Sequence, residues 1–109
     1  MFEIGYHNKV KKDIKKCNKR GFDLKEFLKV IDFLEKTGEV PSYYKPHILS
    51  GNYAGVWECH IKPDWLLLWI KFGNEITIIR TGTHSDYFNL KSKIAIEHFL
   101  FVRKICYSF

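Results

Sequence analysis

The chain has 109 residues and a formal net charge of +6, and its length fits a single domain. Hydrophobic residues make up 46% and aromatic residues 17% of the chain, which excludes a disordered linker. No apolar run approaches the roughly 20 residues that cross a bilayer, and the first residues lack a secretory signal, so we expect a cytoplasmic protein. The basic balance favours a polyanionic partner, either nucleic acid or an acidic protein.

The N-terminal third predicts a short strand and two helices. Residues 2–6 alternate as a strand does, and residues 7–19 place a narrow apolar stripe among many lysines, which suit either a solvated face or phosphate binding. Residues 23–37 predict a second helix, with Asp23 and Glu26 in a capping-box arrangement and a glycine just after the end. We expect the two helices to pack as an antiparallel hairpin.

After the second helix the pattern changes to strands. Residues 56–61, 65–72 and 75–82 predict three strands joined by short turns. The middle strand is apolar almost throughout, as expected at the centre of a sheet that is covered on both faces. This order predicts an α+β fold in which the helical hairpin packs on an antiparallel sheet. The apolar tail, residues 89–109, predicts a short C-terminal helical extension.

Several histidines lie near turns and strand ends in the second half of the chain. His60 precedes Asp64 by four residues, and strand alternation puts it on the face opposite its cysteine and isoleucine neighbours. Because neighbouring strand ends converge in a meander, we expect these side chains to meet at one edge of the sheet: His60, Asp64, Arg80 and His84. The three widely spaced cysteines predict reduced thiols rather than a disulfide framework or a zinc knuckle.

The residues alone leave three functions open. Three histidines and a carboxylate match a common zinc ligand set, although neither HxxxH nor HExxH spacing occurs. Metal-free RNA cleavage is the second: histidine transfers protons, Asp64 acts as a base or orients an imidazole, and Arg80 pairs with phosphate. Aromatic rings would then stack on unpaired bases. The third is protein binding without catalysis.

Two motifs, in order, resemble those of a known family. The stretch YKPHILSGNYAGVWECHIKPDWLLLW, followed by RTGTHSDYF, is similar to the YafQ branch of the RelE/ParE toxin superfamily. The resemblance covers about residues 2–88. It implies a RelE-like fold and a ribosome-dependent mRNA endonuclease of a bacterial type II toxin–antitoxin system, which cuts mRNA in the ribosomal A site without a metal or other cofactor. It also implies a cognate DinJ-like antitoxin, and ribosomal RNA as a partner of the basic helix.

The same resemblance implies roles for individual residues. The matches to the family's catalytic set are His47, His60, Asp64 and His84. The residues expected to bind RNA or phosphate are Arg80, Trp65, Phe88 and Lys45. Among these, His84 is the candidate general acid and Arg80 the candidate phosphate-stabilising group. Trp65 can stack on RNA, pack in the core, or do both.

The tail departs from the family's pattern. Family members typically end at or just after the phenylalanine that matches Phe88, whereas this chain continues through residues 89–109. We therefore expect a toxin domain over residues 1–88 and an extension that packs over the sheet, crowds the active-site edge or contacts the antitoxin. Two alternatives remain: a gyrase-poisoning toxin of the ParE branch, which does not need the histidines, and a catalytically impaired toxin that only binds antitoxin.

Overall fold

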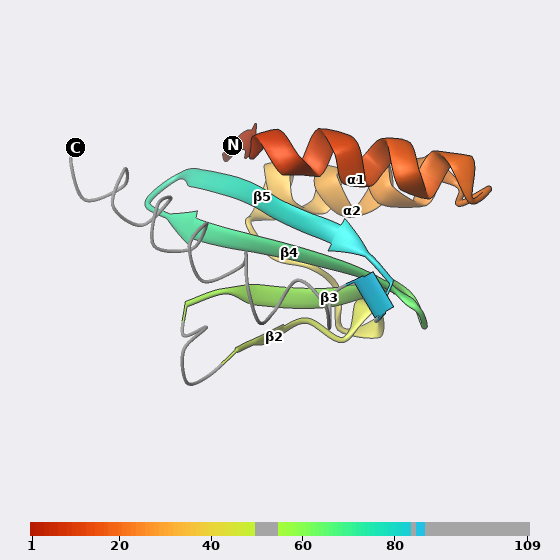
Figure 1. Cartoon of the computed structure of the whole chain (residues 1–109). Coiled ribbons are helices and arrows are strands. Elements are labelled where there is room, and N and C mark those ends of the chain that lie inside the picture. The colour runs from red at the N-terminus through yellow and green to blue at the C-terminus, as the bar shows by residue number, and fades with distance from the viewer. Residues whose placement is uncertain (50–54, 84, 87–109) are drawn as a thin grey trace.

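Two helices lie on one face of a five-stranded sheet, as Figure 1 shows for this computed structural model. The structure describes residues 1–49, 55–83 and 85–86. Its elements, in chain order, are β1 (Glu3–Tyr6), α1 (Asn8–Lys19), α2 (Leu24–Thr37), the 3-10 helix η1 (Ser42–Tyr44), β2 (His47–Ile48), β3 (Trp57–Lys62), β4 (Trp65–Phe72) and β5 (Glu75–Gly82). The α+β class predicted from the sequence is confirmed.

The sheet has the strand order β1-β5-β4-β3-β2. Strands β3, β4 and β5 form the predicted antiparallel meander. The expectation of a wholly antiparallel sheet is wrong, because β1 pairs with β5 in parallel, with Ile4 opposite Ile76. A parallel neighbour needs a long crossover, and here the whole of the intervening chain supplies it. The strand β2 was not predicted, since two residues are too short to show a period.

The ends of α2 follow the sequence signals. Asp23 Oδ1 accepts a hydrogen bond from the Lys25 backbone N–H at 3.0 Å, and Gly38 closes the helix in the left-handed conformation, with a φ of 75°. The Glu26 carboxylate, expected to return to the helix start, pairs with Lys29 Nζ at 3.3 Å. In this structure α1 packs on β5, while α2 packs on β1 and β3.

The main core lies between the helices and the sheet, and it includes buried residues of α1, α2, β3, β4 and β5. The centre of the sheet is β4, which is buried from Trp65 to Trp69, as predicted. Cys59 and Ile61 of β3 belong to this core, so the alternation of β3 directs Glu58 and His60 to the opposite face. A smaller apolar cluster covers part of that face. The alternation of β3 thus places Glu58 and His60 on the face away from the main core.

Two of the three cysteines lie within the described residues. Cys17 and Cys59 are buried and free, and burial raises the pKa of the Cys59 thiol to about 12. A thiol in this state is not a nucleophile at neutral pH. In the part of the chain that the structure describes, no helix is long and apolar enough to span a membrane. Cys106, His84, Phe88 and the predicted helix of the tail lie outside the described residues.

Candidate active site

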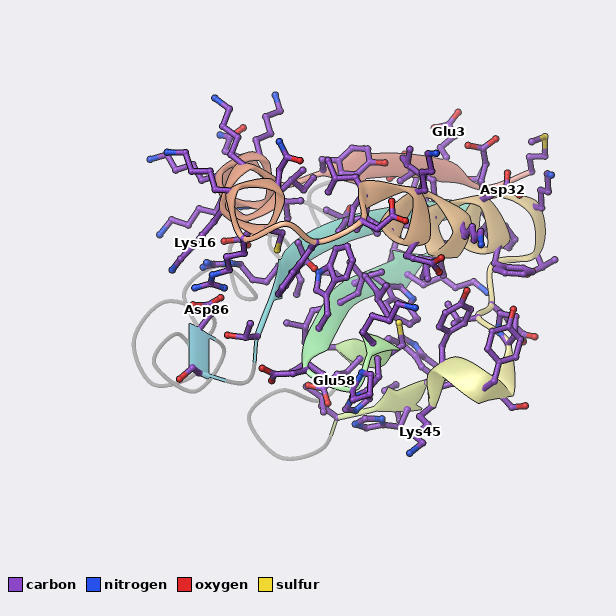
Figure 2. All side chains as sticks on the ribbon, turned by 90° about the vertical axis from the view of Figure 1, so that its right-hand side faces the viewer. Glu3, Lys16, Asp32, Lys45, Glu58 and Asp86 are labelled. Atoms are coloured by element: carbon purple, nitrogen blue, oxygen red, sulfur yellow. The ribbon has the colours of Figure 1, made fainter. Side chains whose placement is uncertain are left out.

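The predicted site residues that the structure describes lie at one end of the sheet. The strand β3 ends there, β4 begins after the turn, β5 ends, and β2 begins. The described candidates that lie at this end are Lys45, His47, His60, Asp64 and Arg80. Figure 2 views this end, with Lys45 and Glu58 below and Lys16 beside Asp86 on the other side. For the described residues His60, Asp64 and Arg80 the backbone positions converge as expected, while the side chains divide into two groups. His84, the fourth residue of that expectation, lies outside the described residues.

The first group centres on His47, which contacts hydrogen-bond acceptors through both ring nitrogens. Its Nε2 lies 3.1 Å from Glu58 Oε1, and its Nδ1 lies 3.1 Å from the Lys45 carbonyl oxygen. The strand register places Glu58 opposite His47. Lys45 has a φ of 53°, a left-handed conformation that turns the chain immediately before β2. Because both nitrogens face acceptors, these contacts hold the His47 ring in one orientation.

Glu58 is a member of the site to which sequence reasoning gave no role. It is buried, and its Oε2 has no hydrogen-bond partner among residues 1–49, 55–83 and 85–86. An unpaired carboxylate oxygen in such a place needs a reason, because leaving it unsatisfied costs free energy. The available sequence signal was its position two residues before His60 on one strand, which puts both side chains on the same face.

His60 lies next to His47, with 6.5 Å between ring centroids and an interplanar angle of 32°. Its Nδ1 lies 3.4 Å from the Pro63 carbonyl oxygen in the following turn. A neutral imidazole that donates from Nδ1 carries its lone pair on Nε2, which is the form a general base requires. Asp64, the next residue of the turn, is exposed. The turn therefore orients His60 through the Pro63 carbonyl. It also exposes the carboxylate of Asp64, which the sequence predicts to act with His60.

Arg80, the predicted phosphate-binding residue, forms a two-pronged ion pair with Asp13 of α1. Its Nε donates to Asp13 Oδ2 at 2.7 Å and its Nη2 donates to Oδ1 at 2.8 Å. The pairing of β1 with β5 ends at Ile78. Further along β5, the Thr81 backbone N–H donates a hydrogen bond to Asp13 Oδ2 at 3.3 Å. Arg80 is 8% exposed, and within the described ranges its Nη1 has no hydrogen-bond partner. One end of the guanidinium is thus buried without a partner among the described residues.

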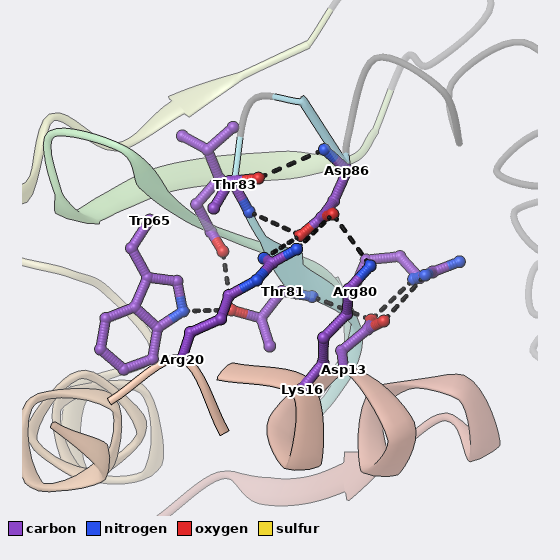
Figure 3. A network of polar contacts seen from close by, with 9 residues as sticks. Asp13, Lys16, Arg20, Trp65, Arg80, Thr81, Thr83 and Asp86 are labelled. Carbon is purple, nitrogen blue, oxygen red and sulfur yellow. Dashed lines mark hydrogen bonds and ion pairs between the residues drawn. The ribbon is translucent and has the colours of Figure 1, made fainter. Parts of the chain in front are cut away.

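Trp65, the first residue of β4, is buried in the main core between the helices and the sheet. It is 2% exposed, and its ring centroid lies 5.0 Å from that of Phe22 and 6.5 Å from that of Phe27. Its Nε1 donates to Thr81 Oγ1 at 2.9 Å, and that hydroxyl donates to the Leu66 carbonyl at 2.7 Å (Figure 3). A base needs an exposed ring face to stack on, so this position corresponds to the core role rather than to direct contact with RNA.

The second group ties the segment after β5 to α1 through Asp86 (Figure 3). Arg20 donates to Asp86 from Nη1 at 2.6 Å and from Nη2 at 3.1 Å, and Lys16 Nζ donates to it at 3.1 Å. Thr83 and Asp86 also exchange side chain–backbone bonds of 3.2 and 3.3 Å, the reciprocal pattern of a capping box. The T-x-x-D spacing was the signal that sequence analysis missed. In sequence, His84 falls between these two anchored residues.

The Asp86 contacts predict a specific response to acid. Hydrogen bonding from Arg20 holds the pKa of Asp86 well below its usual range, so the ionised carboxylate stabilises the fold. This stabilisation is complete above the unfolded-state pKa of about 3.9 and is lost as the pH falls through the folded-state value. We expect Asp86→Asn to be less stable than the wild type at neutral pH and the two to converge below about pH 4, in urea unfolding at a series of pH values.

Asp32→Asn is the matched control, since Asp32 pairs with Lys36 on the exposed surface of α2 with 55% of its side chain accessible. It should reproduce the acid dependence of the wild type. Parallel stability curves for the wild type and Asp86→Asn over the whole pH range would contradict the role assigned to Asp86.

Comparisons with known proteins show which family and which solved structures this chain is similar to. A family model described as the bacterial toxin of type II toxin–antitoxin system, YafQ, matches residues 2–89. The mRNA interferase toxin YafQ of Escherichia coli strain K12 is 32% identical over 87 residues, which cover 79% of this chain and 95% of that protein. The structure of the E. coli DinJ–YafQ complex matches with a TM-score of 0.74 and 30% identity, covering 81% of this chain and 99% of that one.

A metal-bound toxin from Helicobacter pylori also matches, with a TM-score of 0.71 and 38% identity over 79% of this chain and 98% of that one. In the present structure, the ranges 1–49, 55–83 and 85–86 contain no group of three His, Cys, Asp or Glu side chains that could hold a metal ion. His47 and His60 instead have protein acceptors at their Nδ1 atoms. The described residues therefore do not form a metal site by themselves.

Proposed function

This chain belongs to the YafQ family of bacterial toxins of type II toxin–antitoxin systems, and from that premise we propose that it is an mRNA interferase that cuts mRNA in the ribosomal A site. Cleavage there inhibits translation and growth. The observation that carries the proposal is the pair of oriented imidazoles, His47 and His60, 6.5 Å apart at one end of the sheet. In the proposed reaction His60 takes one proton and His47 lines the site beside it, while the second proton comes from His84.

In the proposed reaction, the ribose 2′-hydroxyl attacks the adjacent phosphorus and the 5′-oxygen leaves. His60, which holds Nδ1 toward the Pro63 carbonyl, takes the 2′-hydroxyl proton on Nε2. His84 gives a proton to the departing 5′-oxygen, so the products are a 2′,3′-cyclic phosphate and a 5′-hydroxyl. Asp64 helps to orient the base. His47, held by Glu58 and the Lys45 carbonyl, lines the site beside His60.

Charge that builds on the phosphate oxygens needs a cationic donor. Arg80 offers its Nη1, because Asp13 engages the other side of the guanidinium. Lys45 is exposed next to His47 and supplies a second cation. Phe88 retains its predicted part in holding RNA. Arranged in this way, the ion pair with Asp13 fixes the arginine before RNA arrives, which lowers the ordering cost of binding.

Two macromolecular partners belong to the proposal. The solved DinJ–YafQ complexes support a cognate antitoxin of the DinJ type. The basic face of α1 suits ribosomal RNA, and its exposed lysines outside the Asp86 cluster are Lys11, Lys12, Lys15 and Lys19. Several phosphate contacts would make ribosome binding fall steeply as salt rises.

The proposal is tested by expressing the full chain in bacteria and mapping the 5′ ends of cellular mRNA. We expect new ends within translated reading frames, at ribosomal A sites, and undamaged DNA. The purified protein with programmed ribosomes should give the same cuts with 1,10-phenanthroline, which removes transition metals but leaves the Mg²⁺ that ribosomes need, because no proposed step uses a metal. Intact mRNA with damaged DNA would replace this proposal with gyrase poisoning. Intact mRNA and DNA, with antitoxin still bound, would indicate an impaired toxin.

The proposed domain division is tested in the same assay. A chain that ends at Phe88 is compared with the full chain, since we propose that residues 1–88 carry the activity. Faster cleavage by the shorter chain would mean that residues 89–109 restrain the enzyme, whereas equal cleavage by both would argue against autoinhibition.

A further inference from the structure

A cleft of about 410 Å³ lies beside His60, within the range of about 300–1,000 Å³ that is usual for small-molecule sites. Its walls come from three parts of the fold: Glu26 of α2, Tyr43 and Lys45 at η1, and the end of β3 with Lys62. Because His60 itself lines the cleft, a group bound there lies next to the imidazole that the proposed function uses as a base. The cleft is therefore continuous with the candidate active site.

Tyr43 is the exposed aromatic side chain of this cleft, with 68% of its surface accessible. Its neighbour Tyr44 is 7% exposed and packs edge-on against Phe33, with 6.3 Å between centroids. The Tyr43 ring rests on Tyr44, with 4.4 Å between centroids. An aromatic ring that is backed on one side and open on the other is a ready surface for a second planar ring. Unpaired nucleobases bind proteins by stacking of this kind.

The charged side chains of the cleft favour a phosphate in one part of it and a neutral ring in another. Lys45 and Lys62 are exposed, whereas the carboxyl side chain of Glu26 is 23% accessible and pairs with Lys29. A phosphate is favoured near the exposed lysines and disfavoured near the more enclosed carboxylate. A nucleotide thus enters with its neutral base inside and its phosphate at the rim.

We propose that this cleft is a nucleobase subsite, in which the base of an mRNA nucleotide next to the cleaved phosphate stacks on Tyr43 while Lys45 and Lys62 contact the backbone phosphates. This inference rests on the proposed function and adds the place where one base of the substrate is held. Since every base has a face to stack, the subsite would bind all four and prefer those that stack more strongly.

The test compares Tyr43→Ala, Tyr43→Phe and Tyr6→Ala with the wild type in cleavage of mRNA on programmed ribosomes. Tyr6 is the matched control, a tyrosine that is 40% exposed on β1, at the opposite edge of the sheet from β2. We expect Tyr43→Ala to lower kcat/KM by about 5- to 150-fold, the loss that corresponds to one base–aromatic stack. Tyr43→Phe and Tyr6→Ala should remain near the wild-type value.

Sequencing of the cut sites adds a readout that loss of ribosome docking would not change. Loss of the stack should flatten the base preference at one fixed position relative to the cut, whereas a docking defect lowers all cuts in proportion. Equal kcat/KM in Tyr43→Ala and wild type, an unaltered cut-site profile, or an equal loss in Tyr43→Phe would each overturn the subsite. So would a loss confined to antitoxin binding. A wild-type protein that cuts no mRNA would instead refute the proposed function.

Discussion

Replacing His84 with alanine is expected to lower the rate of mRNA cleavage by about 10²- to 10⁴-fold, the usual contribution of general acid–base catalysis. The rate is expected to fall because the 5′-oxygen would then leave without receiving a proton from His84. Cleavage by purified full-length protein on programmed ribosomes gives the rate, and urea unfolding shows whether the variant is as stable as the wild type. Growth inhibition should disappear with the cleavage.

Two further variants sharpen this result. Ser85→Ala changes the exposed neighbour of His84 and should cut like the wild type. His60→Ala should lose a comparable factor, and the His60/His84 double variant should be little slower than either single one, because acid and base act in a single step. Full toxicity of His84→Ala would show that the general acid has been assigned to the wrong residue.

Replacing Arg80 with alanine is expected to lower the free energy of unfolding by about 3–5 kcal/mol and to slow cleavage by about 10²-fold or more. The stability loss arises because the Asp13 carboxylate, with its side chain 11% exposed, is left buried without its partner. The slower cleavage arises because the Nη1 donor is removed from the site. Urea unfolding and ribosome cleavage measure the two effects separately.

Asp13→Ala separates the two roles of Arg80. It breaks the same ion pair but keeps the guanidinium, so its stability loss should be similar to that of Arg80→Ala. Under conditions in which both variants are folded, we expect Arg80→Ala to cut about 10²-fold more slowly than Asp13→Ala, the usual effect of removing one preorganised donor. Equal rates would mean that Arg80 only supports the fold.

Most of the fold could be predicted from local patterns. The capping residue Asp23, the terminal glycine of α2 and the unbroken apolar run of β4 each act through a few neighbouring residues, so the sequence displays them directly. The pairing of β1 with β5 depends instead on which distant strand the first residues meet, and nothing in a four-residue segment states this. The same holds for β2, which exists because His47 and Ile48 lie along β3.

The sequence predicts which residues form the site better than it predicts the contacts that these residues make. Turn chemistry and alternation placed His60 and Asp64 at a strand end, the convergence of strand ends added Arg80, and the resemblance added His47. Long-range pairing could not be foreseen: Asp13 engages Arg80, and Arg20 engages Asp86, each across most of the chain. Such pairs form wherever α1 happens to cross β5, and the lysine-rich pattern of α1 gives no indication of which residue meets which.

The parallel pairing of β1 with β5 governs when this protein becomes complete during its own synthesis. The first strand made finds its neighbour only after residues 75–78 have emerged, and α1 has no strand to pack on until the same moment. Contacts between segments so far apart form late and slowly. A nascent chain can pair β2, β3 and β4 earlier, but it lacks the β1–β5 pairing and the Asp13–Arg80 pair until residues 75–80 have emerged. Under the proposed function, the order of synthesis protects the ribosome that makes the toxin from the toxin itself.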